Sequence, residues 1–398
     1  MNEKHSGCSI IWLVTVECAR SFLKSNGLTK FMFDPRQYVP VLRWKSSERT
    51  ALCNLDGEIK KRITPIFELV PRDFEDKPTA SVLARHAKQV AESWGWNHLF
   101  FIDFSLLGEG LAAHCLPIFV KEADARNLRV GLTTELHWSE NYQTVVKKAL
   151  AKPGRELCFR LRAYDLRSAG IQKSLDGLLG VFDKLPSDVH LVVDFQSINE
   201  PLPDIAAYIK AIQNFDEWRS FTVIAGAFPK DLSEIEKHSQ YNQPRNDWLI
   251  WKKYATDCTG RIPSFGDYTI QHGIFEEHEG EFLNFSASIR YTASEYWAIM
   301  RGESVFSEKG AGFAQFPAQA QLLLLRPDFC GASFSDGDLY ILTMSQQFTK
   351  SGSAKDWLTA GFNHHLTFVV RQLDDFFAGS SNSAPSTESN PSQHTLQA

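Results

Sequence analysis

Charged residues stand at the ends of several short apolar runs, and these side chains are the ones best suited to chemistry. The carboxylic acids at such positions are Glu68, Asp103, Glu135, Asp194 and Asp267. The basic residues at such positions are Arg43, Lys45, Arg160 and Arg162. In a catalytic arrangement, one carboxylate would act as acid, base or nucleophile while the basic groups hold an anionic or polar substrate.

The apolar runs that carry these residues alternate with amphipathic segments. Eight such runs are found at 38–44, 63–70, 98–104, 128–136, 156–162, 189–195, 221–228 and 262–268. Most are nearly continuous in apolar residues, which is typical of parallel strands covered on both faces. Eight strand and helix units predict an α/β fold of the (β/α)8 TIM-barrel type, in which active sites lie at the C-terminal strand ends.

Strand parity would turn these charged side chains toward the barrel mouth, because alternate residues of a strand face opposite sides. Neighbouring strands lie about 4.8 Å apart, so Glu68, Asp103 and Glu135 are expected within roughly 5 to 8 Å of one another. Like charges about 5 Å apart repel by about 3 kcal/mol at an effective dielectric constant of about 20. A divalent cation, a raised carboxylate pKa or the nearby arginines must offset this repulsion.

The charged residues at the strand ends, called the rim below, have three interpretations. The acids and bases nearly cancel, so they could form a closed network of ion pairs. The rim could instead bind a ligand or catalyse a reaction, and two carboxylates about 5 to 9 Å apart are also the arrangement of glycosidases. A metal site is the third interpretation, although the sequence provides no definite set of metal ligands and indicates no cofactor. The chain contains no Walker A loop, HExxH or GxSxG motif.

The alternation of strands and helices breaks after the eighth strand. Residues 271–347 combine extended and turn-rich pieces, and we expect a long insertion that covers the top of the barrel and offers a surface for a protein partner or a homo-oligomer. The barrel is expected over 32–378 with a long final helix from 354 to 377. Residues 379–398 are polar and predicted to be disordered, and 1–31 are interpreted as an N-terminal extension.

Helical segments are expected after each strand. After the sixth strand the expected helix covers 203–218. After the seventh strand, helical structure is expected from Asp231 onward, followed by a second amphipathic segment at 247–254.

Composition excludes several classes of protein. A net charge of -5 and a pI near 6.2 give no electrostatic indication of nucleic-acid binding or of an acidic membrane partner. The most apolar run, 9–16, is shorter than the roughly 18 residues that span a bilayer. The seven cysteines form neither CxxC motifs nor a Cys/His cluster, which is typical of reduced thiols in the cytoplasm.

Four segments together resemble a known family. They read YVPVLRWKSSERTAL, ITPIFELVP, FGDYTIQ and WLTAGFNHHLTFVVRQL and begin at residues 38, 63, 265 and 357. This set resembles the beta protein family of phages and bacterial genomes over 38–373. The family pattern resembles a chain that starts near Met32, so 1–31 depart from it.

The resemblance implies a role in phage and host conflict, in which the barrel rim binds a ligand or a partner, and it implies no reaction. The positions that match the family motifs are Arg43, Trp44, Lys45, Glu68, Gly266, Asp267, Tyr268, His364 and His365. They add Tyr268, His364 and His365 to the candidates for ligand binding. Considered from the final helix alone, at most one of the two histidines is expected to face the core.

Two other functions fit the same residues. The first is a TIM-barrel hydrolase that acts on phosphodiester or glycosidic substrates through the five acids of the rim. The second is a structural scaffold or oligomer subunit. An open pocket ringed by unpaired carboxylates would favour the hydrolase, whereas a mouth filled by saturated ion pairs would favour the scaffold.

Overall fold

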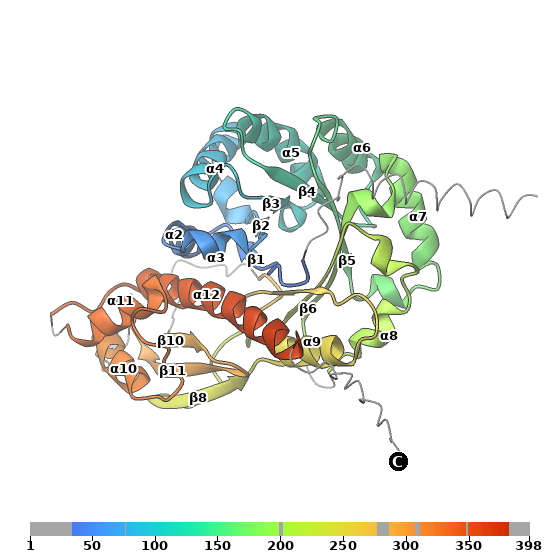
Figure 1. The fold of residues 1–398 in the computed structure, drawn as a ribbon. Coiled ribbons are helices and arrows are strands. Elements are labelled where there is room, and N and C mark those ends of the chain that lie inside the picture. The colour runs from blue at the N-terminus through green and yellow to red at the C-terminus, as the bar shows by residue number, and fades with distance from the viewer. Residues whose placement is uncertain are drawn as a thin grey trace, which may run out of the picture. The chain divides into compact units, whose positions relative to one another are not determined.

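The computed structural model describes residues 34–75, 77–198, 202–276, 286–306, 311–347 and 349–381. In these residues eight parallel strands alternate with helices and form a nearly closed barrel, which an antiparallel sheet and C-terminal helices accompany (Figure 1). The predicted α/β barrel fold is confirmed. The predicted extension at 1–31 lies outside the described residues, as do residues 382–398 of the tail predicted at 379–398. Residues 379–381 of that tail belong instead to the final helix.

The barrel strands follow one another around the sheet in the order β1-β2-β3-β4-β5-β6-β7-β9. They are β1 (Val41–Arg43), β2 (Ile66–Glu68), β3 (Phe100–Asp103), β4 (Val130–Thr134), β5 (Leu157–Arg162), β6 (Val189–Ser197), β7 (Ser220–Gly226) and β9 (Ser264–Asp267). Each lies at one of the eight predicted apolar runs. The first and last strands meet through a hydrogen bond of 3.0 Å from the Val39 amide to the Phe265 carbonyl.

Alternation along the strands separates an apolar outer layer from a charged interior. The side chains packed in the outer hydrophobic core include Leu42, Phe67, Ile102, Leu161 and Val193. On the inner face, Arg43 is paired with Glu68, and Glu68 with Asp103. Because paired residues of adjacent parallel strands share a face, this register carries the charged side chains to the C-terminal mouth of the barrel.

Helices cover the outside of the barrel. They are α2 (Ser46–Cys53), α3 (Gly57–Lys61), α4 (Thr79–Ser93), α5 (Glu109–Asp124), α6 (Glu140–Ala149), α7 (Ile171–Phe182), α8 (Ile205–Ile209) and α9 (Asn246–Asp257). Caps fix several helix starts: Ser139 accepts a hydrogen bond from an amide in the first turn of α6. The helix expected at 203–218 shortens to α8, which ends before a run of turns.

A second sheet has the order β10-β11-β8 and is antiparallel. Its strands are β8 (Ser239–Pro244), β10 (Ser286–Thr292) and β11 (Tyr296–Ser304). The helical structure expected from Asp231 was wrong, because this stretch runs through turns into β8. The sequence SQYNQP has no apolar stripe, and its strand conformation comes from pairing with β11, which lies far along the chain.

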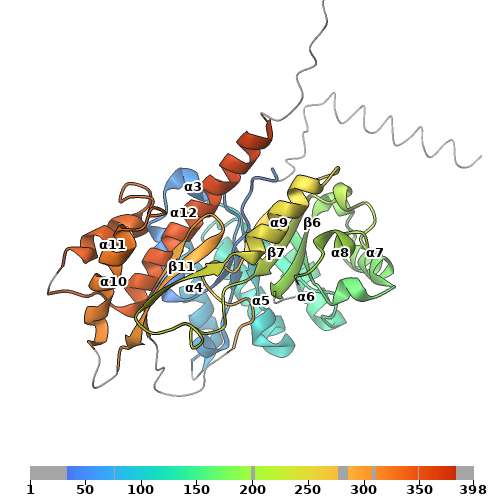
Figure 2. The same cartoon turned by 90° about the horizontal axis from the view of Figure 1, so that it is seen from below.

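The final helix α12 (Ala354–Ser381) lies between the barrel and the second sheet, as Figures 1 and 2 show. It packs against α2 and α3 on one side and against β10 and α11 (Asp336–Ser345) on the other. Helix α10 (Gln315–Leu324) covers the second sheet. An insertion was expected at 271–347. Its first residues cross the barrel mouth, where His272 and Gly273 accept hydrogen bonds from Arg43. The described remainder includes β10 and α11, which pack against α12.

Candidate ligand site at the barrel mouth

Arg160 lies in the barrel mouth and is fully buried, with 0% of its surface exposed. Its guanidinium lies 2.8 Å from Glu68 Oε1, 2.7 Å from Asp103 Oδ2 and 2.7 Å from Asp194 Oδ2. It also donates to the Tyr268 hydroxyl at 2.9 Å, and that hydroxyl donates to Asp194 Oδ2 at 2.7 Å. A single arginine therefore connects the ends of β2, β3 and β6 to the residue that follows β9.

Arg162 and Arg43 extend this network on either side. Arg162 lies 2.7 Å from Asp194 Oδ2 and 2.6 Å from Glu135 Oε1. Arg43 Nε lies 3.9 Å from Glu68 Oε2. The Glu135 side chain is 15% exposed, more than the other carboxylates of the network, so the Glu135 side of the mouth is the side nearest to solvent.

The carboxylates of the network titrate differently. Burial would raise the pKa of Asp103 and of Asp194, but the charges of Arg160 and Arg162 lower both pKa values below the ordinary range. Burial dominates at Glu135 and raises its pKa, although Arg162 opposes the shift. Of these three carboxylates, Glu135 is therefore the one that most readily takes up a proton.

The chain that follows β9 covers the mouth. Arg43 donates to the carbonyls of His272 at 2.8 Å and Gly273 at 3.2 Å. A Cβ atom on Gly273 would lie 2.5 Å from the carbonyl oxygen of Gln196, so only glycine permits this close approach. Gln271 lies between Arg43 and the buried carboxylate of Glu48, to which it donates at 2.7 Å.

The structure brings most of the predicted site residues into this one network. They are Arg43, Glu68, Asp103, Glu135, Arg160, Arg162, Asp194 and Tyr268. Lys45 is exposed, and its ammonium lies 5.1 Å from the centre of the Phe275 ring. Of the interpretations of the rim, the closed ion-pair network describes its geometry best.

Asp267 lies outside the mouth, because it precedes the inward-facing Tyr268 and therefore points to the outer face of the barrel. Its carboxylate accepts a hydrogen bond from the Tyr38 hydroxyl and lies 3.0 Å from His365 Nε2. His365 Nδ1 lies 2.8 Å from Thr292 Oγ1. This group joins β9, α12 and β10 beneath the surface.

His364 makes an equivalent set of contacts on the neighbouring face of α12. Its Nδ1 lies 2.8 Å from Asp338 Oδ2, its Nε2 lies 2.8 Å from the Thr292 carbonyl, and its ring stacks on Tyr291. Both histidines are 0% exposed, so the expectation that at most one faces the core was wrong. The reason is that α12 is covered on both sides. Both nitrogens of each ring are in hydrogen-bond contact, so neither histidine has a nitrogen available to a ligand.

The described residues include no group of three or more His, Cys, Asp or Glu side chains placed to hold a metal ion. At the mouth, guanidinium groups occupy the positions between carboxylates where a cation would lie. No helix in the described ranges has the length and apolar character needed to cross a membrane.

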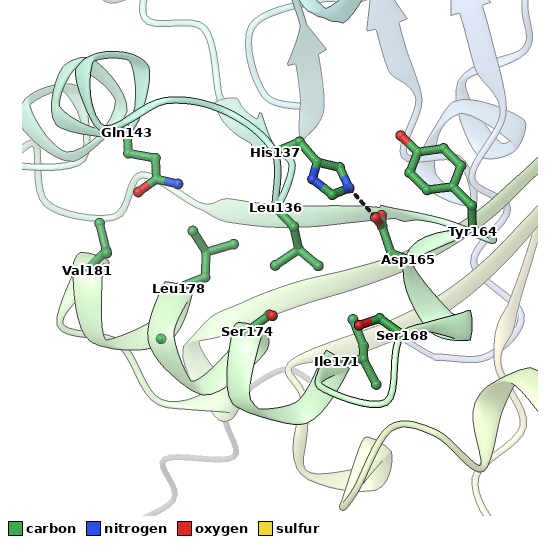
Figure 3. A pocket seen from close by; sticks show the side chains of 11 residues that line it. Leu136, His137, Gln143, Tyr164, Asp165, Ser168, Ile171, Ser174, Leu178 and Val181 are labelled. Carbon is green, nitrogen blue, oxygen red and sulfur yellow. Dashed lines mark hydrogen bonds and ion pairs between the residues drawn. The ribbon is translucent and has the colours of Figure 1, made fainter.

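A groove of about 500 Å³ opens beside the mouth, between the segments that follow β4 and β5 (Figure 3). This volume lies within the range of about 300 to 1,000 Å³ that is usual for small-molecule sites. The apolar side chains that line it include Leu136, Ile171, Leu178 and Val181. The polar side chains that line it are His137, Gln143, Tyr164, Asp165, Ser168 and Ser174.

A histidine and an aspartate form the polar end of this groove. His137 Nε2 lies 2.5 Å from Asp165 Oδ1, and Asp165 Oδ2 accepts a hydrogen bond of 2.8 Å from the Arg162 amide. The Asp165 side chain is 1% exposed, whereas that of His137 is 64% exposed and stacks against the ring of Tyr164. Arg162 therefore takes part in both places: its side chain belongs to the mouth and its backbone positions Asp165.

The sequence analysis missed His137, Tyr164 and Asp165. A signal was present, because each follows a strand-end charge, Glu135 or Arg162, by two or three residues. The loops after barrel strands are where this fold carries its functional side chains. The predicted candidates were strand-end residues, whereas these three side chains lie in the loops that follow.

A family model described as Beta protein matches residues 38–371. The chain belongs to the Beta protein family. Among curated proteins no match was found. The matched region contains the eight barrel strands, the mouth network, the groove and most of α12. The resemblance expected from the four sequence segments is thereby confirmed.

Replacing Arg160 tests whether the mouth is a structural network. Arg160→Met should lower the free energy of unfolding by about 3–5 kcal/mol, because three buried carboxylates would lose their shared cation. Lys61→Met is the control, since Lys61 and Glu58 form an exposed pair that contributes less than about 1 kcal/mol. Urea unfolding followed by tryptophan fluorescence gives both values. Equally small effects in the two variants would refute the network's structural role.

The carboxyl group of Asp247 is also buried and interacts electrostatically with Asp267. Asp247 is 1% exposed, and burial raises its pKa to about 7, with Arg245 opposing and Asp267 adding to the shift. Between its ordinary value of 3.8 and about 7 the folded state binds a proton that the unfolded state releases, so this group makes the folded state less stable as pH rises through that range.

Asp247→Asn removes this titration. Relative to the wild type, the variant should be more stable at pH 8 than at pH 5, and the difference should shrink by up to about 1.4 kcal/mol per pH unit on acidification. Urea unfolding at pH 5, 6, 7 and 8 measures the difference. A difference that stays constant over this range would show that Asp247 is ionised throughout.

Proposed function

We propose that the protein binds a small ligand in the groove between α6 and α7 at the barrel rim, and that it acts in this way in conflict between phages and bacterial hosts. The observation that carries the proposal is the groove itself, with exposed His137 beside buried Asp165 at its polar end. The setting in phage and host conflict rests on the family alone. A cytoplasmic location is proposed from the cysteine pattern, and the cysteines among the described residues are unbonded.

The mouth network supports ligand binding at the groove better than hydrolysis at the mouth. Glu68, Asp103 and Asp194 are almost fully buried and each contacts Arg160. A phosphodiester or glycosidic substrate would have to displace that arginine before it reached a carboxylate. Glu135 is the most exposed carboxylate of the network, at 15%, and it directly precedes Leu136, which lines the groove.

A partner or oligomer surface within 271–347 is the second proposal. Its support is a set of exposed leucines on or next to α10 and α11, namely Leu322, Leu325 and Leu339. Surface apolar groups of this kind favour association when they are contiguous. Light scattering at several protein concentrations tests it: a mass that stays that of one chain throughout would rule out self-association.

Filling the groove tests the ligand proposal. Ser174 lies on the exposed side of α7 and lines the groove, as Figure 3 shows, so Ser174→Trp should block it without disturbing the core. Lys173→Trp is the matched control, because Lys173 is exposed on the same helix and does not line the groove. A fragment library examined by saturation-transfer NMR should give hits with the wild type and the control that Ser174→Trp loses.

The same pair of variants tests the biological setting. A host that expresses the wild type or Lys173→Trp should restrict phage plating, and Ser174→Trp should not. Fragment binding that survives in Ser174→Trp would remove the groove from the proposal. If both variants restrict phage equally, the groove is not required for phage defence.

A further inference from the structure

We infer that the groove takes a small organic cation, an amine whose apolar body lies along α7 and whose ammonium group meets His137. The inference specifies the ligand class of the binding site proposed above and rests on that proposal. It is supported by the charges that line the groove, the hydrogen-bonding state of His137, the exposed ring of Tyr164 and the apolar wall.

The groove carries negative charge without a matching cation in its lining. Asp165 is the only carboxylate among the residues that line it, and none of those residues is Lys or Arg. The partners of the Asp165 carboxylate are His137 and the Arg162 amide, and an amide brings no net charge. The Arg162 guanidinium is engaged by Glu135 and Asp194. Phosphate and carboxylate ligands would therefore be repelled, because they carry the same negative charge as the groove.

The Asp165 contact fixes which nitrogen of His137 is available. Because the Asp165 carboxylate accepts from Nε2–H, the neutral imidazole keeps its lone pair on Nδ1. Within the described ranges Nδ1 makes no hydrogen bond, and Figure 3 shows it on the side of the ring that faces away from Asp165. An ammonium N–H that donates to Nδ1 would complete a chain of ammonium, imidazole and carboxylate, in which opposite charges lie at the two ends.

The tyrosine beside His137 is in the same negative field. Tyr164 is 56% exposed and its ring lies nearly parallel to that of His137. Burial, together with the charges of Asp165 and Glu135, raises the pKa of Tyr164, while Arg162 opposes the shift. A field that disfavours a phenolate favours an ammonium, and an exposed aromatic face attracts cations in addition.

The remaining lining suits the body of such a ligand. Leu136, Ile171, Leu178 and Val181 form an apolar wall, and uncharged groups of Gln143 and Ser174 stand at intervals along it. Burying a hydrocarbon chain or ring on this wall would supply affinity, whereas the ammonium at His137 would supply the orientation. Phenylalkylamines have this pattern of one cation and one apolar ring.

Three probes of nearly equal shape test the charge preference. They are 2-phenylethylamine, 2-phenylethanol and phenylacetate, measured by isothermal titration calorimetry at pH 7.5. The amine should bind at least about tenfold more tightly than the alcohol, and phenylacetate should bind more weakly than either. Asp165→Asn should lower the affinity for the amine by about tenfold while leaving that for the alcohol unchanged, because it removes the charge and keeps the shape.

His137→Gln provides a second variant on an exposed side chain, which does not endanger folding, and it should weaken amine binding in the same way. His238→Gln is its control, because His238 is also exposed and does not line the groove.

The outcomes separate the two proposals. If alcohol or phenylacetate binds as tightly as the amine, and Asp165→Asn changes nothing, the ligand groove stands and the cation inference fails. If neither these probes nor the fragment library binds to the wild type, the groove is not a ligand site, and both proposals fail.

Discussion

A buried arginine shared by three carboxylates is the constraint on which the barrel mouth depends. Removing a guanidinium from water costs several kcal/mol, and only close ion pairs with good hydrogen bonds offset that cost. Arg160 obtains them from Glu68, Asp103 and Asp194, each on a different strand, and from Tyr268 beyond the last strand. The strand ends are therefore held at fixed distances from one another.

This arrangement moves the accessible chemistry away from the barrel axis. A TIM barrel usually presents its functional groups at the C-terminal strand ends, but here those groups mostly bind each other and the chain after β9 covers them. Exposed polar side chains lie one loop further out, at His137 and Tyr164. Arg162 connects the two places, because its side chain is fixed in the mouth while its amide holds Asp165. The network thus pre-organises the groove.

The sequence predicted the barrel because that fold follows from local patterns. Eight apolar runs with intervening amphipathic segments are visible in the chain, and parity correctly indicated that Glu68, Asp103 and Arg160 share a mouth. Parity failed for β9, since its four residues, SFGD, alternate too briefly to show which face Asp267 takes. It also gave no means of telling that a second sheet covers α12, which is why both His364 and His365 are buried.

What the sequence could not predict depends on contacts between distant segments. Strand β8 is polar and forms only because β11 pairs with it. The groove exists because the loops after β4 and β5 lie side by side. The contact between Asp165 and His137 joins these two loops, and neither loop alone indicates it.

The central claim is that the mouth is a fixed network and that ligands bind beside it. Crystals soaked with 2-(4-bromophenyl)ethylamine test this most directly, because bromine can be located by its anomalous scattering. The account predicts a bromine peak between α6 and α7, with the ion pairs of Arg160 unchanged. A peak inside the mouth, with Arg160 displaced from Asp103 and Asp194, would contradict it.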